Sequence, residues 1–209
     1  PRLLARKGKR FVVTHPWLAR EHPDPDGLQL HTLVEELRQQ GADDSDLVFI
    51  CYCSMFQHDH KDKALQRIKD NNQPVPAPGS HPAVRTPDQE REFKRGLWGL
   101  WRLYSNRRFN VLALPDVPSA AASKRPYIDR GWCYLESSLS HLNRTLSNKK
   151  NPKVADLLNH MPADPAEFER QLESNKTFTG GDKRDVLEQF RRVFQDKERL
   201  DNLLERVLS

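Results

Sequence analysis

The sequence lacks the features of membrane proteins and of disulfide-stabilised secreted proteins. No apolar run approaches the roughly 20 residues of a membrane-spanning helix. The basic segment Pro1 to Arg10 is not followed by the apolar stretch of a secretory signal. Cysteine occurs only 3 times in 209 residues, an odd number that does not fit a disulfide framework. We therefore expect a soluble, cytoplasmic protein with reduced thiols and no membrane partner.

Glycine and apolar residues are also scarce. None of the 9 glycines belongs to a Walker loop or a Gly-x-Gly-x-x-Gly turn, so these two phosphate-binding loops are absent from the sequence. Apolar residues make up 36% of the chain, so the material for a core must be concentrated in a few segments. The net charge of +5 is small enough to fit an anionic small molecule, an acidic partner or weak nucleic-acid contact.

The apolar segments alternate between two kinds of pattern. Continuous apolar runs at residues 11–14, 47–51 and 109–114 predict three strands. Leucine, valine and aromatic residues at spacings of three and four predict helices within 30–37, 93–104 and 132–146. Strands that alternate with helices indicate an α/β protein with a parallel sheet flanked by helices.

The remaining segments divide the chain into parts. We expect a basic, solvated N-terminal arm at 1–10, an α/β domain at 11–148 and a helical C-terminal extension at 149–209. Five prolines within residues 58–87 predict an insertion that crosses the surface of the α/β domain. Beyond Asn148 only helical patterns remain, and the last of them is a long amphipathic helix that starts near Asp182.

A short motif follows the third predicted strand. It consists of Tyr127, the pair Trp132 and Cys133, and Glu136 near the start of a helix. Over residues 10 to 146 the order of elements and this motif resemble the Toll/interleukin receptor (TIR) domain family. The resemblance implies a flavodoxin-like parallel sheet. Arg130 stands where the family often has serine, and the family's fourth and fifth strands have no clear counterpart unless weak strands lie at 148–153 and 176–179.

The resemblance also implies an activity. Many TIR domains cleave the bond between nicotinamide and ribose in NAD with one glutamate, which corresponds to Glu136 here. Nicotinamide leaves as a neutral group, so the reaction needs stabilisation of the oxocarbenium ion on the ribose rather than an acid. One carboxylate is sufficient for that task. NAD or a related nucleotide is then the substrate, and we expect no cofactor and no metal.

Further residues are candidates for substrate binding. Thr14, His15 and Trp17 end the first predicted strand at the edge where parallel sheets bind ligands. Trp132 lies one helical turn before Glu136, and Tyr104 belongs to an aromatic helix face that could stack on a base. Each has a structural alternative: Trp132 and Cys133 fit core packing, and an early helical glutamate such as Glu136 fits a solvated position favoured by the helix dipole.

Other hypotheses stay open at this stage. A non-enzymatic TIR-like interaction module would self-associate through TIR-like surfaces or the C-terminal helix, and a nucleotide- or nucleic-acid-binding domain would act without turnover. Cys51, Cys53, His58 and His60 supply zinc-ligand types, but the single residue between the cysteines is a tighter gap than usual. Five basic residues favour a solvated helix face over a nucleic-acid surface. They are Lys94, Arg95, Arg102, Arg107 and Arg108.

Overall fold

The computed structural model describes residues 8–20, 22–59, 62–71, 73–178 and 182–208. Within them lies a parallel sheet of three strands in the order β2-β1-β3, which confirms the predicted α/β class. In this sheet Val12 pairs with Phe49 on one side and with Val111 on the other. The strands are β1 (Arg10–Thr14), β2 (Leu47–Phe49) and β3 (Asn110–Ala113).

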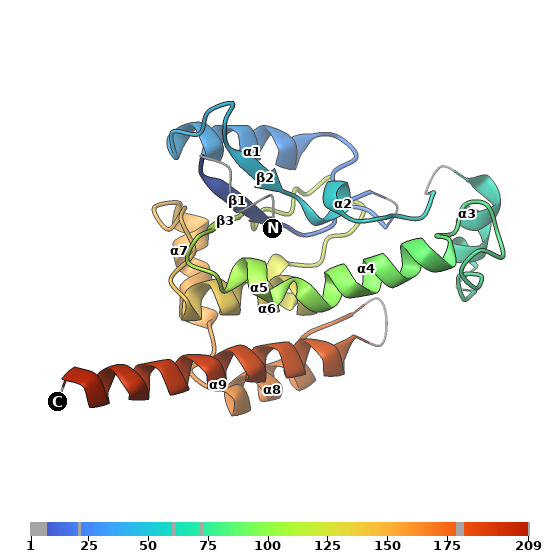
Figure 1. Ribbon diagram of the computed structural model, residues 1–209. Helices are drawn as coiled ribbons and strands as arrows, with labels where there is room; N and C mark the ends of the chain where they lie inside the picture. The colour runs from blue at the N-terminus through green and yellow to red at the C-terminus, as the bar shows by residue number, and fades with distance from the viewer. Residues whose placement is uncertain (1–7, 21, 60–61, 72, 179–181, 209) are drawn as a thin grey trace.

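The two faces of the sheet are covered by different helices (Figure 1). Side chains alternate between the faces of a strand, so Phe11 and Val13 point one way, and Val12 points the other. The first pair packs with Leu33 of helix α1 (Leu28–Gln39). The other face packs against α5 (Trp101–Tyr104) and α6 (Gly131–Leu142). These helices enclose the sheet from both sides.

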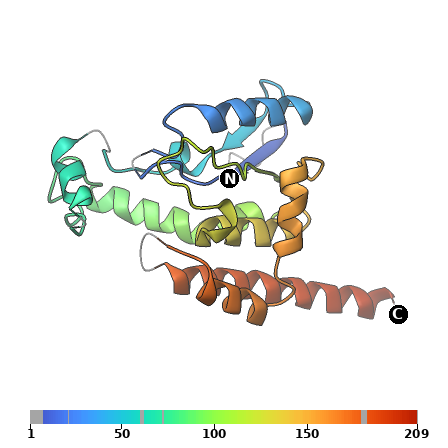
Figure 2. The same cartoon turned by 180° about the vertical axis from the view of Figure 1, so that it is seen from behind.

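The C-terminal extension adds a further layer behind α6, as both views show (Figures 1 and 2). Its helices α8 and α9 contact α6 through a stack of three aromatic rings. Tyr134 of α6 lies on Phe168 at 5.0 Å between ring centroids, and Phe168 lies on Phe190 at 4.1 Å. All three rings are buried, so the extension shares one core with the α/β part. Its helices are α7 (Pro152–Leu157), η3 (Leu158–His160), α8 (Pro165–Ser174) and α9 (Lys183–Leu208).

Three predicted elements differ in detail from the observed ones. The aromatic helix is split at Leu100 into α4 (Pro87–Gly99) and α5. The second apolar run is a strand only as far as Phe49, because Cys51 begins the short helix α2 (Cys51–Ser54). Helix α6, expected to reach Leu146, ends at Leu142.

The edge of the sheet beside β3 holds a remnant of a fourth strand. Leu146 forms a single parallel bridge with Val111, and no further strand follows among the described residues. Next along the chain, the side-chain amide of Asn148 accepts a hydrogen bond from the Ala113 N–H (3.1 Å) and donates one to the Ala113 carbonyl (2.9 Å). In the segment 176–179, the alternative position for a weak strand, Thr177 forms one bridge with Arg130, and residue 179 lies outside the described residues.

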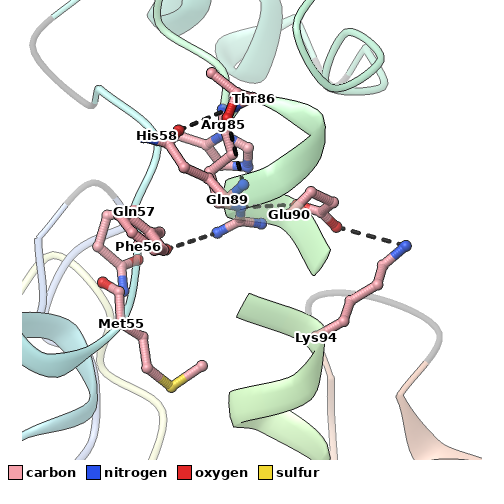
Figure 3. A network of polar contacts seen from close by, with 9 residues as sticks. All are labelled: Met55, Phe56, Gln57, His58, Arg85, Thr86, Gln89, Glu90 and Lys94. Atoms are coloured by element: carbon pink, nitrogen blue, oxygen red, sulfur yellow. Dashed lines mark hydrogen bonds and ion pairs between the residues drawn. The ribbon is translucent and has the colours of Figure 1, made fainter. Parts of the chain in front are cut away.

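The proline-rich insertion lies at the far end of α4 from the sheet (Figure 1). It contains helix α3 (Lys63–Asp70) and a small core of its own, formed by Leu65, Ala83 and Val84. The Arg85 guanidinium fastens it to α4, because it donates hydrogen bonds to the Glu90 carboxylate (2.8 Å) and the Phe56 carbonyl (3.1 Å) (Figure 3).

Lys9, near the end of the predicted solvated arm, is bound to the α/β part. Lys9 Nζ donates hydrogen bonds to the carbonyls of Gln40 (2.7 Å) and Gly41 (2.6 Å), at the C-terminal end of α1. This position suits a cation, because the last carbonyls of a helix carry partial negative charge. Residues 1–7 of the predicted arm lie outside the described residues. None of the described helices is both long and apolar enough to cross a membrane.

Candidate functional site

Glu136 lies in the second turn of α6, beneath the carboxyl end of β1. Its side chain is almost fully buried, with 8% of the residue exposed. The hydroxyl groups of Thr14 and Tyr104 lie near its carboxyl group and act to lower its pKa. The predicted catalytic residue therefore lies in the core beside two of the five predicted substrate-binding residues.

The local sequence explains why these three groups meet. Thr14 ends β1 and shares the face of Val12, which looks toward α6. Tyr104 ends α5, and its hydroxyl also donates a hydrogen bond to the Val13 carbonyl (3.1 Å). A phenol has one proton, so Tyr104 cannot donate to that carbonyl and to a carboxylate at the same time. When Glu136 is protonated it can donate to the phenol oxygen, and both hydrogen bonds are then satisfied.

The buried position changes the acidity of Glu136. Removal from water raises its pKa to about 7 from the ordinary value of 4.5, although the hydrogen bonds from Thr14 and Tyr104 act to lower it. No lysine or arginine of the described chain contributes to this shift. The carboxyl group is therefore close to half ionised at neutral pH and is not held by a guanidinium.

Three residues outside the predicted set complete this group. The Tyr127 hydroxyl lies 2.7 Å from Thr14 Oγ1. Burial raises the pKa of Cys51 to about 12 and raises that of Cys133, and the charge of Glu136 adds to both effects. Both thiols therefore stay protonated at neutral pH. Tyr127 and Cys133 belong to the motif in the sequence, whereas nothing near Cys51 in the sequence indicated that it lies beside Glu136.

The other three predicted substrate-binding residues lie elsewhere. His15 faces α1, where its Nδ1 hydrogen bonds with the Gln29 side chain (2.7 Å). The Trp17 ring meets the Tyr52 ring edge-on at 5.5 Å. The Trp132 indole N–H donates to Asp182 at the start of α9 (3.1 Å). These contacts direct the three side chains to three separate neighbours, away from the hydroxyl cluster around Glu136.

Arg130 joins the loops that frame this edge of the sheet. Its guanidinium donates hydrogen bonds to the carbonyl of Trp17 (2.6 Å), the hydroxyl of Ser123 (3.0 Å) and the carbonyl of Arg125 (2.9 Å). Burial lowers the pKa of Arg130, but the group remains a cation and a fivefold donor. The residue that departs from the family motif therefore connects the loop after β1 to the loop after β3.

Two hollows lie near this edge, and Glu136 lines neither of them. One, of about 540 Å³, lies between the loop after β3 and α7; Tyr127 contributes to its wall. The other, of about 180 Å³, lies between β1, α1 and α2 and includes His15 in its lining. Tyr127 thus connects the larger hollow with the hydroxyl cluster around Glu136.

The zinc hypothesis gains no support from the described residues. No three histidine, cysteine, aspartate or glutamate side chains gather there in an arrangement that could hold a metal ion. His60, one of the four ligand types named from the sequence, lies outside the described residues. Of the basic residues on the aromatic helix, Lys94 and Arg95 form ion pairs with Glu90 and Glu92. These two cations are partly neutralised within their own helix.

No protein-family model, curated protein or solved structure matches this chain.

Proposed function

We propose that the protein is a TIR-like NAD glycohydrolase that uses Glu136 to cleave the bond between nicotinamide and ribose. The observation that carries the proposal is a buried carboxyl group at the carboxyl edge of a parallel sheet, with a pKa of about 7 and hydroxyl rather than cationic neighbours. A single carboxylate held in this way can stabilise a positive charge that develops on a sugar.

The strand order supports a flavodoxin-like architecture. In this fold the order begins 2-1-3, and ligands bind where the connections from neighbouring strands leave to opposite faces. Here the chain runs from β1 to α1 on one face and from β3 to α6 on the other. Thr14 ends β1, and Glu136 belongs to α6. Both therefore adjoin the expected ligand position.

In the proposed reaction the bond from ribose C1′ to the nicotinamide nitrogen breaks, and its electron pair leaves with the neutral base. The ionised Glu136 carboxylate stabilises the oxocarbenium ion, and Thr14 keeps the carboxylate oriented. Water then adds its oxygen to C1′ and releases a proton to solvent or to the carboxylate. Because the ionised form is required, the rate should rise with pH through a pKa of about 7.

The dinucleotide must also reach the carboxyl group, only 8% of whose residue is exposed. The loops that Arg130 joins lie at this edge, and their separation would open the way to Glu136. Loops that close over a reaction site exclude water from the developing charge. We therefore propose that these loops move apart to admit the dinucleotide.

The test measures release of nicotinamide from NAD by the purified full chain. Glu136→Gln should lower the rate by about 100-fold or more, because the amide cannot offset the charge on the sugar. Glu35→Gln is the matched control, since the Glu35 side chain is exposed on α1, and it should leave the rate unchanged. Equal rates for the wild type and Glu136→Gln, or no release by the wild type, would refute the proposal.

The alternative, a self-associating interaction module, is favoured by a different observation. Half or more of the surface of Leu200, Leu203 and Leu204 is exposed on the distal part of α9, which projects beyond the other helices (Figures 1 and 2). A second copy of this helix would cover these leucines. Light scattering should then give a mass that rises with concentration for the wild type and stays monomeric for Leu200→Glu combined with Leu204→Glu. A monomeric wild type would eliminate this alternative.

A further inference from the structure

The hollow of about 180 Å³ lies on the opposite face of the sheet from the hydroxyl cluster around Glu136. Its floor is apolar and is formed by Val13, Leu33 and Leu114. Val13 and Thr14 are neighbours in β1, so their side chains point to opposite faces. The hollow and Glu136 are therefore at the same edge of the sheet but are separated by β1.

Aromatic rings form one wall of this hollow. Tyr52 and His22 both line it, and their ring centroids are 4.8 Å apart. Trp17 supports Tyr52 from outside with an edge-on contact. Flat aromatic walls favour flat ligands, which gain stacking contacts in addition to burial. A hollow of this volume is smaller than the roughly 300–1,000 Å³ of drug-sized ligand sites, so it suits one ring system.

Asp24 supplies two acceptor oxygens to the lining, which also includes the hydroxyl group of Tyr52 and the thiol of Cys53. Asp24 Oδ2 accepts a hydrogen bond from the Leu30 N–H (2.8 Å). Asp24 Oδ1 is buried, and within the described part of the chain it has no hydrogen-bond partner. A buried acceptor without a partner costs free energy, which a ligand that donates a hydrogen bond would recover.

His15 offers a second acceptor. The Gln29 side chain donates from Nε2 to the Pro16 carbonyl (2.8 Å), so its oxygen faces His15 Nδ1, and that nitrogen carries the proton. Burial keeps the pKa of His15 below its ordinary value, so the ring is neutral near pH 7 and Nε2 is an acceptor. No lysine or arginine is among the lining residues of this hollow, which disfavours a phosphate.

We propose that this hollow binds a planar heteroaromatic base that carries an exocyclic amino group, with the amino group donating to Asp24. The ring faces of Tyr52 and His22, inclined at 66° to each other, favour contact with a flat ring, and the Asp24 carboxylate favours a donor over a carbonyl at the edge of that ring. The site is independent of the proposed cleavage at Glu136, because it uses none of the residues around that carboxyl group.

Adenosine and inosine are matched probes for this site. They differ at one edge of the base, where adenosine has an amino group beside an unprotonated ring nitrogen and inosine has a carbonyl beside a ring N–H. Titration calorimetry with the full chain should give at least about tenfold tighter binding for adenosine, since a hydrogen bond to a charged group contributes about 1.5–3 kcal/mol. Equal affinities, or no heat of binding for adenosine up to its solubility limit, would overturn the proposal.

A substitution tests the role of Asp24 directly. Asp24→Asn keeps an oxygen for the Leu30 N–H and replaces the other oxygen by an amide N–H₂, so the preference should move at least about tenfold toward inosine. Asp26→Asn, on the same exposed turn but not in the lining, should leave the preference unchanged. An unchanged ratio in Asp24→Asn would refute the assignment. Repeating the titration in Glu136→Gln separates it from the cleavage proposal, because loss of turnover should not alter adenosine binding.

Discussion

The two faces of the sheet are covered by different numbers of helical layers. On the α1 face one helix covers the strands, and the core there consists of apolar side chains such as Phe11, Leu33 and Leu112. On the α6 face the cover is two layers deep, and a carboxyl group and several hydroxyl groups lie inside it. Glu36 of α1 is also buried, but its carboxylate accepts a hydrogen bond from the Asn151 side chain (2.8 Å), whereas Glu136 has hydroxyl neighbours.

The second layer is what keeps those neighbours fixed. The stack of Tyr134, Phe168 and Phe190 packs α8 and α9 against α6 on the side of that helix opposite Glu136. On the α1 face no second layer of helices packs behind α1 among the described residues, and the polar pair His15 and Gln29 lies at the rim of the core. The comparison implies that loosening the α6 face should affect stability and chemistry together.

The largest expected effect comes from the charge of Glu136. Its pKa is raised in the folded protein to about 7 from 4.5, so the wild type is most stable below pH 4.5 and loses stability as pH rises through 7. Glu136→Gln carries no charge and escapes this loss. In urea unfolding it should be more stable than the wild type by about 3 kcal/mol above pH 8, with no gain near pH 4.

Leu33→Ala on the α1 face is the control for this prediction. It removes apolar contacts and should lower the free energy of unfolding by about 2–4 kcal/mol. This loss should be the same at every pH. If the difference between Glu136→Gln and the wild type did not change with pH, the carboxyl group would not titrate in the core and the contrast between the two faces would fail.

The next effect concerns the contact between the extension and the start of α6. A Cβ atom on Gly131 would lie 1.9 Å from Phe178 Cζ, so Gly131→Ala must displace that ring. We expect a loss of about 2–3 kcal/mol in thermal or urea unfolding, the burial free energy of one aromatic side chain. Gly99→Ala has nothing within 4 Å of its Cβ and should stabilise α4 by up to about 1 kcal/mol. Equal effects of the two substitutions would contradict the close packing of the extension.

The smallest effect lies outside both faces, where Arg85 fastens the insertion (Figure 3). The guanidinium lies 3.6 Å from the centre of the Phe93 ring and is 10% exposed. Arg85→Gln should lower the free energy of unfolding by about 1–2 kcal/mol and should increase the rate of proteolysis within the insertion. The rate of nicotinamide release should not change. Arg91→Gln breaks an exposed ion pair on α4 and should lower the free energy of unfolding by less than about 0.5 kcal/mol. Proteolysis at the wild-type rate in Arg85→Gln would show that the fastening lies elsewhere.

The sequence was sufficient to predict most of the elements. Continuous apolar runs located all three strands of the described sheet. β1 and β3 are largely buried, which needs apolar residues at successive positions, whereas Val48 of the edge strand β2 is 41% exposed. Thr86 caps the start of α4, and Gln89 completes a capping box there, which places the start of the helix before the predicted range of 93–104. The end of α6 was predicted wrongly, because Leu146 continues the helical spacing of leucines although its backbone pairs with Val111.

The group around Glu136 was predictable only in part. Strand alternation predicts the face on which Thr14 lies, and Tyr127 is part of the sequence motif. Local sequence patterns are therefore enough to identify these two residues. The environment of Trp132 depends on Asp182, which lies 50 residues further along the chain. His15 alternates with Thr14 and so belongs to the other face, which strand periodicity alone could have indicated. Contacts between remote segments decide such cases, and no periodicity encodes them.

Asn148 has a consequence for how the protein behaves among its own copies. Its carboxamide presents to Ala113 the same donor and acceptor that the backbone of an incoming strand would offer. The edge of β3 at Ala113 is therefore already hydrogen-bonded to a side chain. The Ala113 N–H and carbonyl on this edge are not available to pair with another peptide strand. Together with the backbone bridge between Leu146 and Val111, this side chain protects the short sheet against edge-to-edge polymerisation on this side.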